Sequence, residues 1–215
     1  MNSKLNYLNA LGILCWVKRT LMVSPSVACE IEFDWEGLQS AVKSCVACPL
    51  HKTRTQTVFG MGNPQSPLML IGEGPGANED LQGLPFVGRA GQLLNAMLKA
   101  IQLDRDKVYI ANVIKCRAPK NRDPLPEEIS SCTPFLEKQI QTIKPRLIVA
   151  LGRVAAHYLL KTKSSMAQLR GKVHSRQGIP LIVTYHPAYL LRNPIDKAQA
   201  LKDIYCIRDF LNSHT

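Results

Sequence analysis

The sequence predicts an α/β fold: a single domain with a central four-stranded parallel sheet flanked by helices. Two observations support this. Four short apolar runs can form buried strands, at residues 68–71, 108–111, 147–151 and 181–184. Segments with helical periodicity lie between them, and strand–helix alternation of this kind favours a parallel sheet covered on both faces.

The chain before the first strand is expected to be helical. In residues 1–33, Leu5, Leu8, Leu11 and Leu14 recur at roughly helical spacing, so we expect an N-terminal helical extension there. The domain itself is expected to span residues 34–215. It would begin with a second helix, from Asp34 to Val46.

The remaining helices are expected between and after the strands. Residues 91–101 place apolar side chains on one face, and residues 126–143 begin with a proline suited to a first helical turn. Residues 154–160 follow the third strand, and residues 198–211 close the chain. Gln177-Gly178 predicts a hairpin-like turn that leads into the fourth strand.

Charge indicates the kind of partner. The formal net charge of +11 and the pI of about 9.5 favour a polyanion, nucleic acid first; the alternative is an ordinary basic protein. The sequence has no run of about 18 apolar residues and no convincing secretory signal, so we expect no membrane association and a cytoplasmic location.

Cysteine spacing predicts a metal centre. In a reducing compartment, clustered cysteines indicate metal ligands rather than disulfides. Cys45 and Cys48 form a C-x-x-C pair, and Cys116 and Cys132 follow far downstream. Such a tetrad binds either zinc or an iron–sulfur cubane. The other three cysteines, Cys15, Cys29 and Cys206, lack partners at ligand spacing and are expected to be ordinary thiols.

Unusual residues follow the predicted strands. Ligands bind at the carboxyl ends of parallel strands, and those ends carry the glycine-rich segment Gly72–Gly76, Asn112 and His186. The glycines either let backbone N–H groups approach a ligand closely or form an ordinary turn.

Three side chains near this rim have chemistry suited to a nucleobase. The Asn112 amide can read the imide edge of uracil and refuse cytosine, or it can cap its strand. A neutral His186 can stabilise negative charge on a departing base oxygen, or serve structure. The Phe86 ring can stack on a base, or belong to the core.

Two basic segments can hold phosphates. Arg117, Lys120 and Arg122 follow Cys116, and Lys172 lies in a second basic stretch before the last strand. The alternative is solvated charge.

Taken in order, these motifs resemble one family. The chain is similar to the family 4 uracil-DNA glycosylases, small iron–sulfur members of the uracil-DNA glycosylase superfamily, over about residues 34–211 and with all four cysteines in order. The resemblance rests on four segments: Glu73–Asp80, Pro85–Gly91, Asn112–Arg122 and His186–Arg192.

The resemblance implies an enzyme that hydrolyses the glycosidic bond of deoxyuridine in single- and double-stranded DNA, acting as a monomer. It implies a [4Fe–4S] cluster on Cys45, Cys48, Cys116 and Cys132. The implied substrate-binding residues are Gly72, Glu73, Gly74, Pro75, Gly76, Phe86, Asn112 and His186. The implied minor-groove segment runs from His186 to Arg192 and includes Tyr189 and Arg192, with Leu190 or Leu191 as the wedge.

The resemblance leaves the water-activating group open. Gly74 stands where family 1 enzymes carry a water-activating aspartate, so Glu79 is the first candidate for that role and Asp80 the second. The expected catalytic residues are then Glu79, His186 and Asn112.

Two other functions compete with this interpretation. A zinc-stapled nucleic-acid-binding module would explain the charge and the cysteines, but would leave Asn112, Phe86 and His186 without a shared purpose. A redox enzyme would need a second cofactor site, and the sequence has no flavin or nicotinamide fingerprint.

Overall fold

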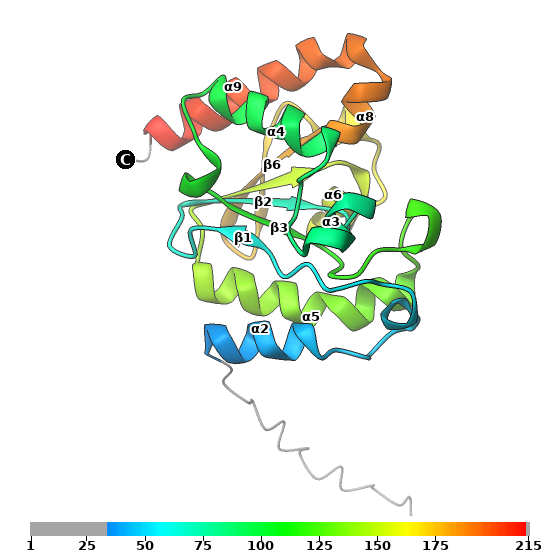
Figure 1. The fold of residues 1–215 in the computed structure, drawn as a ribbon. Coiled ribbons are helices and arrows are strands. Elements are labelled where there is room, and N and C mark those ends of the chain that lie inside the picture. Colours follow the sequence, from blue (N-terminus) through cyan, green and yellow to red (C-terminus); the bar gives the residue numbers. More distant parts are fainter. Residues whose placement is uncertain (1–33, 214–215) are drawn as a thin grey trace, which may run out of the picture. The chain divides into compact units, whose positions relative to one another are not determined.

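The computed structural model describes residues 34–213 and confirms the predicted α/β architecture (Figure 1). The strands are β1 (Met61–Gly62), β2 (Leu68–Gly72), β3 (Tyr109–Asn112), β4 (Leu147–Leu151), β5 (Val173–Arg176) and β6 (Ile179–Thr184). They form one sheet in the order β1-β3-β2-β4-β6-β5. The four central strands are parallel, as predicted, and β1 and β5 pair antiparallel at the two edges. The expected extension over residues 1–33 lies outside the described residues.

The expected helices are present, with small shifts at their ends. The helices of the described part are α2 (Trp35–Lys43), α3 (Ala77–Gln82), α4 (Arg89–Lys99), α5 (Pro126–Ile143), α6 (Arg153–Leu160), α7 (Met166–Leu169), α8 (Pro187–Arg192) and α9 (Lys197–Ser213). Short 3₁₀ turns lie at η1 (Pro49–Lys52), η2 (Arg105–Lys107), η3 (Pro119–Asn121) and η4 (Pro194–Asp196). The sequence did not predict the short elements β1, α3, α7 and α8, because each is too brief to show a clear period. No helix in residues 34–213 has the length and apolar character needed to cross a bilayer.

Alternation along the strands divides the core into two layers. On β2, Leu68 and Leu70 face the side covered by α4, α8 and α9, whereas Met69 and Ile71 face α5 and α6. Figure 1 shows the sheet with α4, α8 and α9 on one side and α5 on the other. Helix α2 packs outside α5, where Trp35 meets Phe59 edge-on with ring centroids 5.2 Å apart. This position brings the Cys45–Cys48 segment toward α5, which carries Cys132.

A buried carboxylate ties α9 to the sheet. Asp203, only 3% exposed, accepts a hydrogen bond from the Thr184 hydroxyl at 2.7 Å at the end of β6. The same oxygen pairs with Arg170 Nε at 2.8 Å. Removing one member of such a pair leaves an uncompensated buried charge.

We therefore expect Asp203→Ala to lower the free energy of unfolding by about 3–5 kcal/mol in urea denaturation. Asp209→Ala is the matched control, because Asp209 pairs with Arg208 at the surface of the same helix and is 66% exposed. That change should cost far less. Equal losses in the two variants would contradict a structural role for the buried pair.

Candidate active site

The predicted rim residues, except Gly72, surround one cavity of about 640 Å³ at the carboxyl ends of the central strands. It is lined by Glu73, Gly74, Pro75, Gly76, Glu79, Phe86, Ala90, Asn112, Ile114, Ala118, Asn121, Arg122, Asp123, Gly152, Arg153, Met166, Tyr185, His186, Ala188, Tyr189 and Arg192. Segments far apart in the sequence meet here because parallel strands end at the same edge of the sheet.

Strand register places Gly72 directly beside Asn112, which lines the cavity. The two residues are partners in the β2–β3 ladder. A Cβ atom at position 72 would stand 2.6 Å from Asn112 Oδ1 and 2.7 Å from Phe86 Cζ. Both contacts are closer than carbon atoms tolerate, so glycine at this position is what lets the amide and the ring approach each other.

The Asn112 side chain carries an unused acceptor. Asn112 is 2% exposed, and its Oδ1 has no hydrogen-bond partner among residues 34–213. Buried polar atoms are nearly always paired, and leaving one unpaired typically costs about 1–3 kcal/mol. The Asn112 main-chain oxygen, by contrast, accepts a bond from buried Lys115 Nζ at 3.0 Å, which fixes the backbone below the amide. The free oxygen is therefore available to a ligand.

His186 is held as a neutral donor. It begins α8, and its Nδ1 lies 3.2 Å from the Ala188 N–H, from which it accepts a hydrogen bond. Burial, and then the nearby Arg192 charge, lower the His186 pKa to about 4. With Nδ1 occupied as an acceptor, the neutral ring carries its proton on Nε2. The imidazole can then donate one hydrogen bond from Nε2.

The Phe86 ring lies against His186. Their ring centroids are 5.5 Å apart with an interplanar angle of 32°, and Phe86 is 5% exposed. Phe86 also packs in the core layer with α4. The ring therefore belongs to the core, as one alternative from the sequence predicted, while one face of it is placed where the other alternative, stacking on a base, would need it. The Phe86 ring forms one wall of the cavity.

The two acidic candidates differ in what they contact. Glu79 lines the cavity, and its Oε1 accepts the N–H groups of Val87 and Gly88, each at 2.9 Å. Its Oε2 makes no hydrogen bond within the described chain. Asp80, 3% exposed, instead accepts the Thr55 N–H with both oxygens at 3.0 Å and does not line the cavity. The geometry thus favours Glu79 over Asp80 for holding a water molecule.

Position 74 cannot easily carry a side chain. A Cβ atom there would stand 2.6 Å from Ile114 Cγ1. An acidic residue at this position would require Ile114 to move, which agrees with a carboxylate being supplied from elsewhere.

Glu73, another acidic residue that lines the cavity, has a shifted pKa. Burial, and then the Asp123 charge, raise the pKa of Glu73 to about 7, although Arg153 acts in the opposite direction. Arg153, which also pairs with Asp123, was not predicted from the sequence. It follows Gly152 at the carboxyl end of β4, so the rule that placed the other three strand ends at the rim would have identified it.

The predicted minor-groove segment, His186 to Arg192, contains both buried and partly exposed side chains. Leu190 is 1% exposed and packs in the core layer with α4 and α9, so it is not available as a wedge. Leu191 is only half-buried and remains the candidate. Tyr189 and Arg192 line the cavity, and the Tyr189 hydroxyl donates to Asp196 at 2.7 Å.

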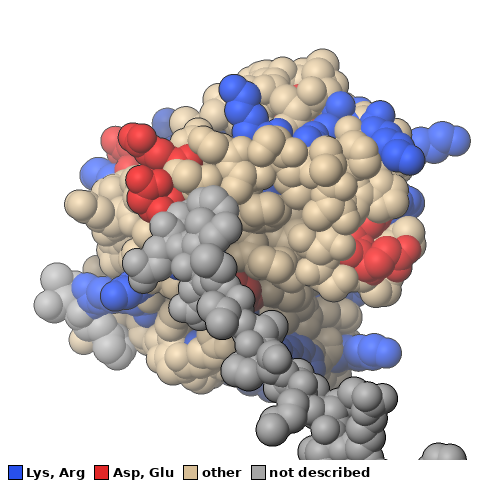
Figure 2. Space-filling model, turned by 90° about the horizontal axis from the view of Figure 1, so that it is seen from below, with Lys and Arg blue, Asp and Glu red and all other residues tan. Residues whose placement is uncertain are grey.

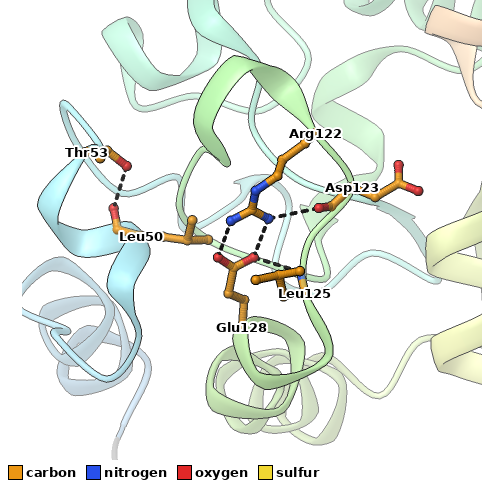
Figure 3. A network of polar contacts seen from close by, with 6 residues as sticks. All are labelled: Leu50, Thr53, Arg122, Asp123, Leu125 and Glu128. Carbon is orange, nitrogen blue, oxygen red and sulfur yellow. Dashed lines mark hydrogen bonds and ion pairs between the residues drawn. The ribbon is translucent and has the colours of Figure 1, made fainter.

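The predicted phosphate-binding residues also differ from one another. Arg122 forms a two-pronged pair with buried Glu128, at 2.8 and 2.6 Å, and Glu128 in turn accepts the Leu125 N–H (Figure 3). Arg122 therefore holds the carboxylate of Glu128 in the first turn of α5. Arg117 donates to Asn121 at 2.8 Å, whereas Lys120 and Lys172 are exposed. Figure 2 shows basic side chains spread along the edges of the face seen from below, with acidic ones in smaller groups.

The four predicted metal ligands gather in one region. Burial raises the pKa of Cys116, and the nearby Cys48 and Cys45 thiols raise it further. Burial raises the pKa of Cys132 to about 12, with smaller contributions from Cys116 and Cys48. Cys116 Sγ accepts a bond from Arg54 Nη1 and Cys132 Sγ from the Lys115 N–H, both at 3.1 Å. Within residues 34–213, no three His, Cys, Asp or Glu side chains close around a point that would hold a single ion.

Fold and site together define a class: an α/β domain with a pocket at the sheet edge, lined by a buried amide, a neutral histidine and an aromatic wall. Comparison with known proteins agrees. Residues 59–207 match the profile of the Uracil DNA glycosylase superfamily. The type-4 uracil-DNA glycosylase of Thermotoga maritima is 44% identical over 180 residues, covering 82% of this chain and 94% of that protein. The type-4 enzyme of Archaeoglobus fulgidus is 45% identical over 161 residues, covering 71% of this chain and 81% of that protein.

The similarity extends more weakly to a neighbouring branch. A type-5 uracil-DNA glycosylase of Pyrobaculum aerophilum is 31% identical over 164 residues, covering 66% of this chain and 72% of that protein. The chain belongs to the uracil-DNA glycosylase superfamily, in its type-4 branch.

The protonation state of His186 can be tested directly. At pH 6 the ring should be neutral with its proton on Nε2, because burial holds its pKa at about 4. Two-dimensional ¹⁵N NMR of labelled protein, assigned with the His186→Ala spectrum, reports both the charge of the ring and the nitrogen that carries the proton. Since the unfolded state binds this proton more readily, the His186 contribution to stability should be lost as the pH falls from about 6.5 toward 4. A His186 ring that titrates near pH 6.5 would contradict the assignment.

Proposed function

We propose that this protein hydrolyses the N-glycosidic bond of deoxyuridine in DNA, releasing uracil and leaving an abasic site for base excision repair. Membership in the type-4 branch supports the reaction. Among the structural observations, the unpaired Oδ1 of buried Asn112 is the one that carries the choice of base.

Asn112 would select uracil by its hydrogen-bonding pattern. Its Oδ1 accepts the N3–H of uracil and its Nδ2 donates to O4. Cytosine presents an acceptor at N3 and a donor at N4, so both contacts would become repulsive or unpaired. A site that is built to pair polar groups rejects analogues strongly, because its own buried groups would then remain unsatisfied.

His186 would stabilise the departing base. Breaking the glycosidic bond leaves negative charge on uracil and positive charge on the sugar. A donor fixed at the position where charge develops stabilises the transition state without reorganisation. The neutral ring with its proton on Nε2 meets this requirement, and stacking on Phe86 would hold the base in place.

Glu79 would position the attacking water. Its Oε1 is anchored by the Val87 and Gly88 N–H groups, which leaves Oε2 on the cavity side free to accept from water. The same negative charge would stabilise the sugar cation. Glu73, Gly74, Pro75 and Gly76 would enclose the base.

DNA binding would use the surface around this cavity. The target base must leave the helix, which costs a few kcal/mol in duplex and less in single strands, so we expect activity on both. Leu191 would fill the space left in the duplex, with Tyr189 and Arg192 beside it. Arg117, Lys120 and Lys172 would contact phosphates. We expect the domain of residues 34–215 to act as a monomer.

We further propose that Cys45, Cys48, Cys116 and Cys132 hold a [4Fe–4S] cluster. Cys45, Cys48 and Cys116 lie close enough to influence one another's charge, as do Cys48, Cys116 and Cys132, and four cysteine thiolates are the usual ligand set of such a cluster. When bound, the cluster would cross-link the segment after α2, the strand-β3 loop and α5. Reduced thiols of this kind suit the cytoplasm.

The decisive experiment is single-turnover incubation of cluster-loaded protein with oligonucleotides containing one uracil. Uracil should be released and cytosine spared, with abasic sites revealed by alkali. Asn112→Ala should lose both rate and discrimination, and His186→Ala should slow cleavage by about 10²-fold or more. Asn212→Ala, an exposed change at the end of α9, is the control and should behave as wild type. No abasic product from excess wild-type enzyme would refute the proposed function.

A separate measurement tests the metal ligands. Replacing Cys45, Cys48, Cys116 or Cys132 by alanine should lower iron content and thermal stability together, since a ligand to the cluster also closes a long loop. Cys206→Ala is the matched control, because Cys206 is exposed on α9. Visible absorbance of anaerobically purified protein distinguishes a cluster from zinc. Equal iron in Cys206→Ala and the four ligand variants would show that the tetrad is wrongly chosen.

A further inference from the structure

The turn that carries Phe86 has an unusual backbone. Phe86 adopts a φ of 53°, in the left-handed region that bulky side chains rarely occupy. The turn is also tightly enclosed, because a Cβ atom at Gly91 would stand 1.8 Å from the Phe86 carbonyl oxygen. Such a conformation persists only where the surroundings hold it, and it is concentrated at functional sites.

Arg105 holds the turn from one side by donating hydrogen bonds to its carbonyl oxygens. It lies in η2, just before β3, and its Nη1 donates to the Phe86 carbonyl at 2.7 Å while its Nη2 donates to the Pro85 carbonyl. Nη1 also lies 3.3 Å from Asn95 Oδ1 on α4. Arg105 does not line the active-site cavity; it borders a separate shallow hollow with Met61 and Asp104.

Glu79 supplies the other side. Its carboxylate accepts the N–H groups of the next two residues, Val87 and Gly88. Four consecutive residues of the turn, 85 to 88, are thus fixed by two charged side chains, one donating and one accepting. Hydrogen bonds to charged groups are roughly twice as strong as neutral ones.

The chemistry of Arg105 indicates a dedicated role. Its half-buried guanidinium has no carboxylate within ion-pair distance among the described residues, and burial lowers its pKa. A buried cation is ordinarily paired with an acid. Here its strongest contacts are main-chain oxygens, whose position sets the direction of the Phe86 ring.

We propose that Arg105 is a positioning residue that acts through Phe86, holding the ring in the orientation that stacks on the extruded base. The proposal rests on the proposed function, since it concerns the base-stacking wall of the same pocket. Arg105 itself touches neither base nor DNA.

Single-turnover uracil excision tests the coupling. Arg105→Ala should slow cleavage by roughly 10- to 100-fold, because small misplacement of a substrate-positioning group costs rate in that range. Affinity for DNA containing a stable abasic-site analogue should stay at the wild-type value. Arg105→Lys should lie between, since an ammonium cannot span both carbonyls as the fork does. Asn95→Ala, which removes the other Arg105 partner, should retain the wild-type rate.

A double-mutant cycle separates positioning from general stability. If Arg105 acts through the ring, Phe86→Ala and the Phe86→Ala/Arg105→Ala double variant should cleave at the same rate. The proposal would be overturned if the rate losses of the two single variants multiplied in the double variant. A wild-type rate in Arg105→Ala would also overturn it. Should Arg105→Ala fail to fold, Arg105→Lys carries the same cycle.

A readout independent of activity keeps this inference distinct from the proposed function. The chain has only 5 Phe residues, so 4-fluorophenylalanine labelling gives an assignable ¹⁹F spectrum. The Phe86 resonance should shift or broaden in Arg105→Ala and stay unchanged in Asn95→Ala. An unmoved Phe86 resonance in Arg105→Ala overturns the proposal whatever the enzyme does, whereas absence of uracil release with a moved resonance refutes only the function.

Discussion

The pairing of Gly72 with Asn112 in the β2–β3 ladder is the constraint on which the site depends. It sets an amide at the end of one strand against a residue without a side chain on the next, and the Phe86 ring occupies the space that a Cβ would need. Within residues 34–213, the buried Oδ1 of Asn112 has no hydrogen-bond partner. An unpaired buried polar atom lowers the stability of the unliganded protein. It also makes the site more selective, because only a base with the complementary group can pair with it.

The electrostatics of the cavity follow from its burial. The same desolvation that holds His186 neutral raises the pKa of Glu73 toward neutrality, so the pocket carries less charge than its residue list suggests. A neutral donor beside a base that becomes an anion is worth more in such surroundings than in water. Glu79 is held in place in this pocket by the main-chain N–H groups of Val87 and Gly88.

Beside the cavity, which Arg122 also lines, charged residues build the frame around the cysteines. Arg122 and buried Glu128 join the loop after Cys116 to the first turn of α5 (Figure 3). Glu128 precedes Cys132 by four residues, about one helical turn. Arg54 and Lys115 donate directly to two of the sulfurs. The region is therefore organised by hydrogen bonds of the chain itself, into which a cluster can be set.

The sequence by itself determined the four parallel strands, their main helices and the convergence of Gly72, Asn112 and His186, because hydrophobic period and strand ends are local signals. It could not determine which predicted side chains were free to act. Leu190 lies in the core and Arg122 is bound by Glu128, while Arg105 holds the turn that carries Phe86. These outcomes depend on partners distant in the sequence, whose contacts exist only once the sheet has brought them together; a local pattern carries no record of them.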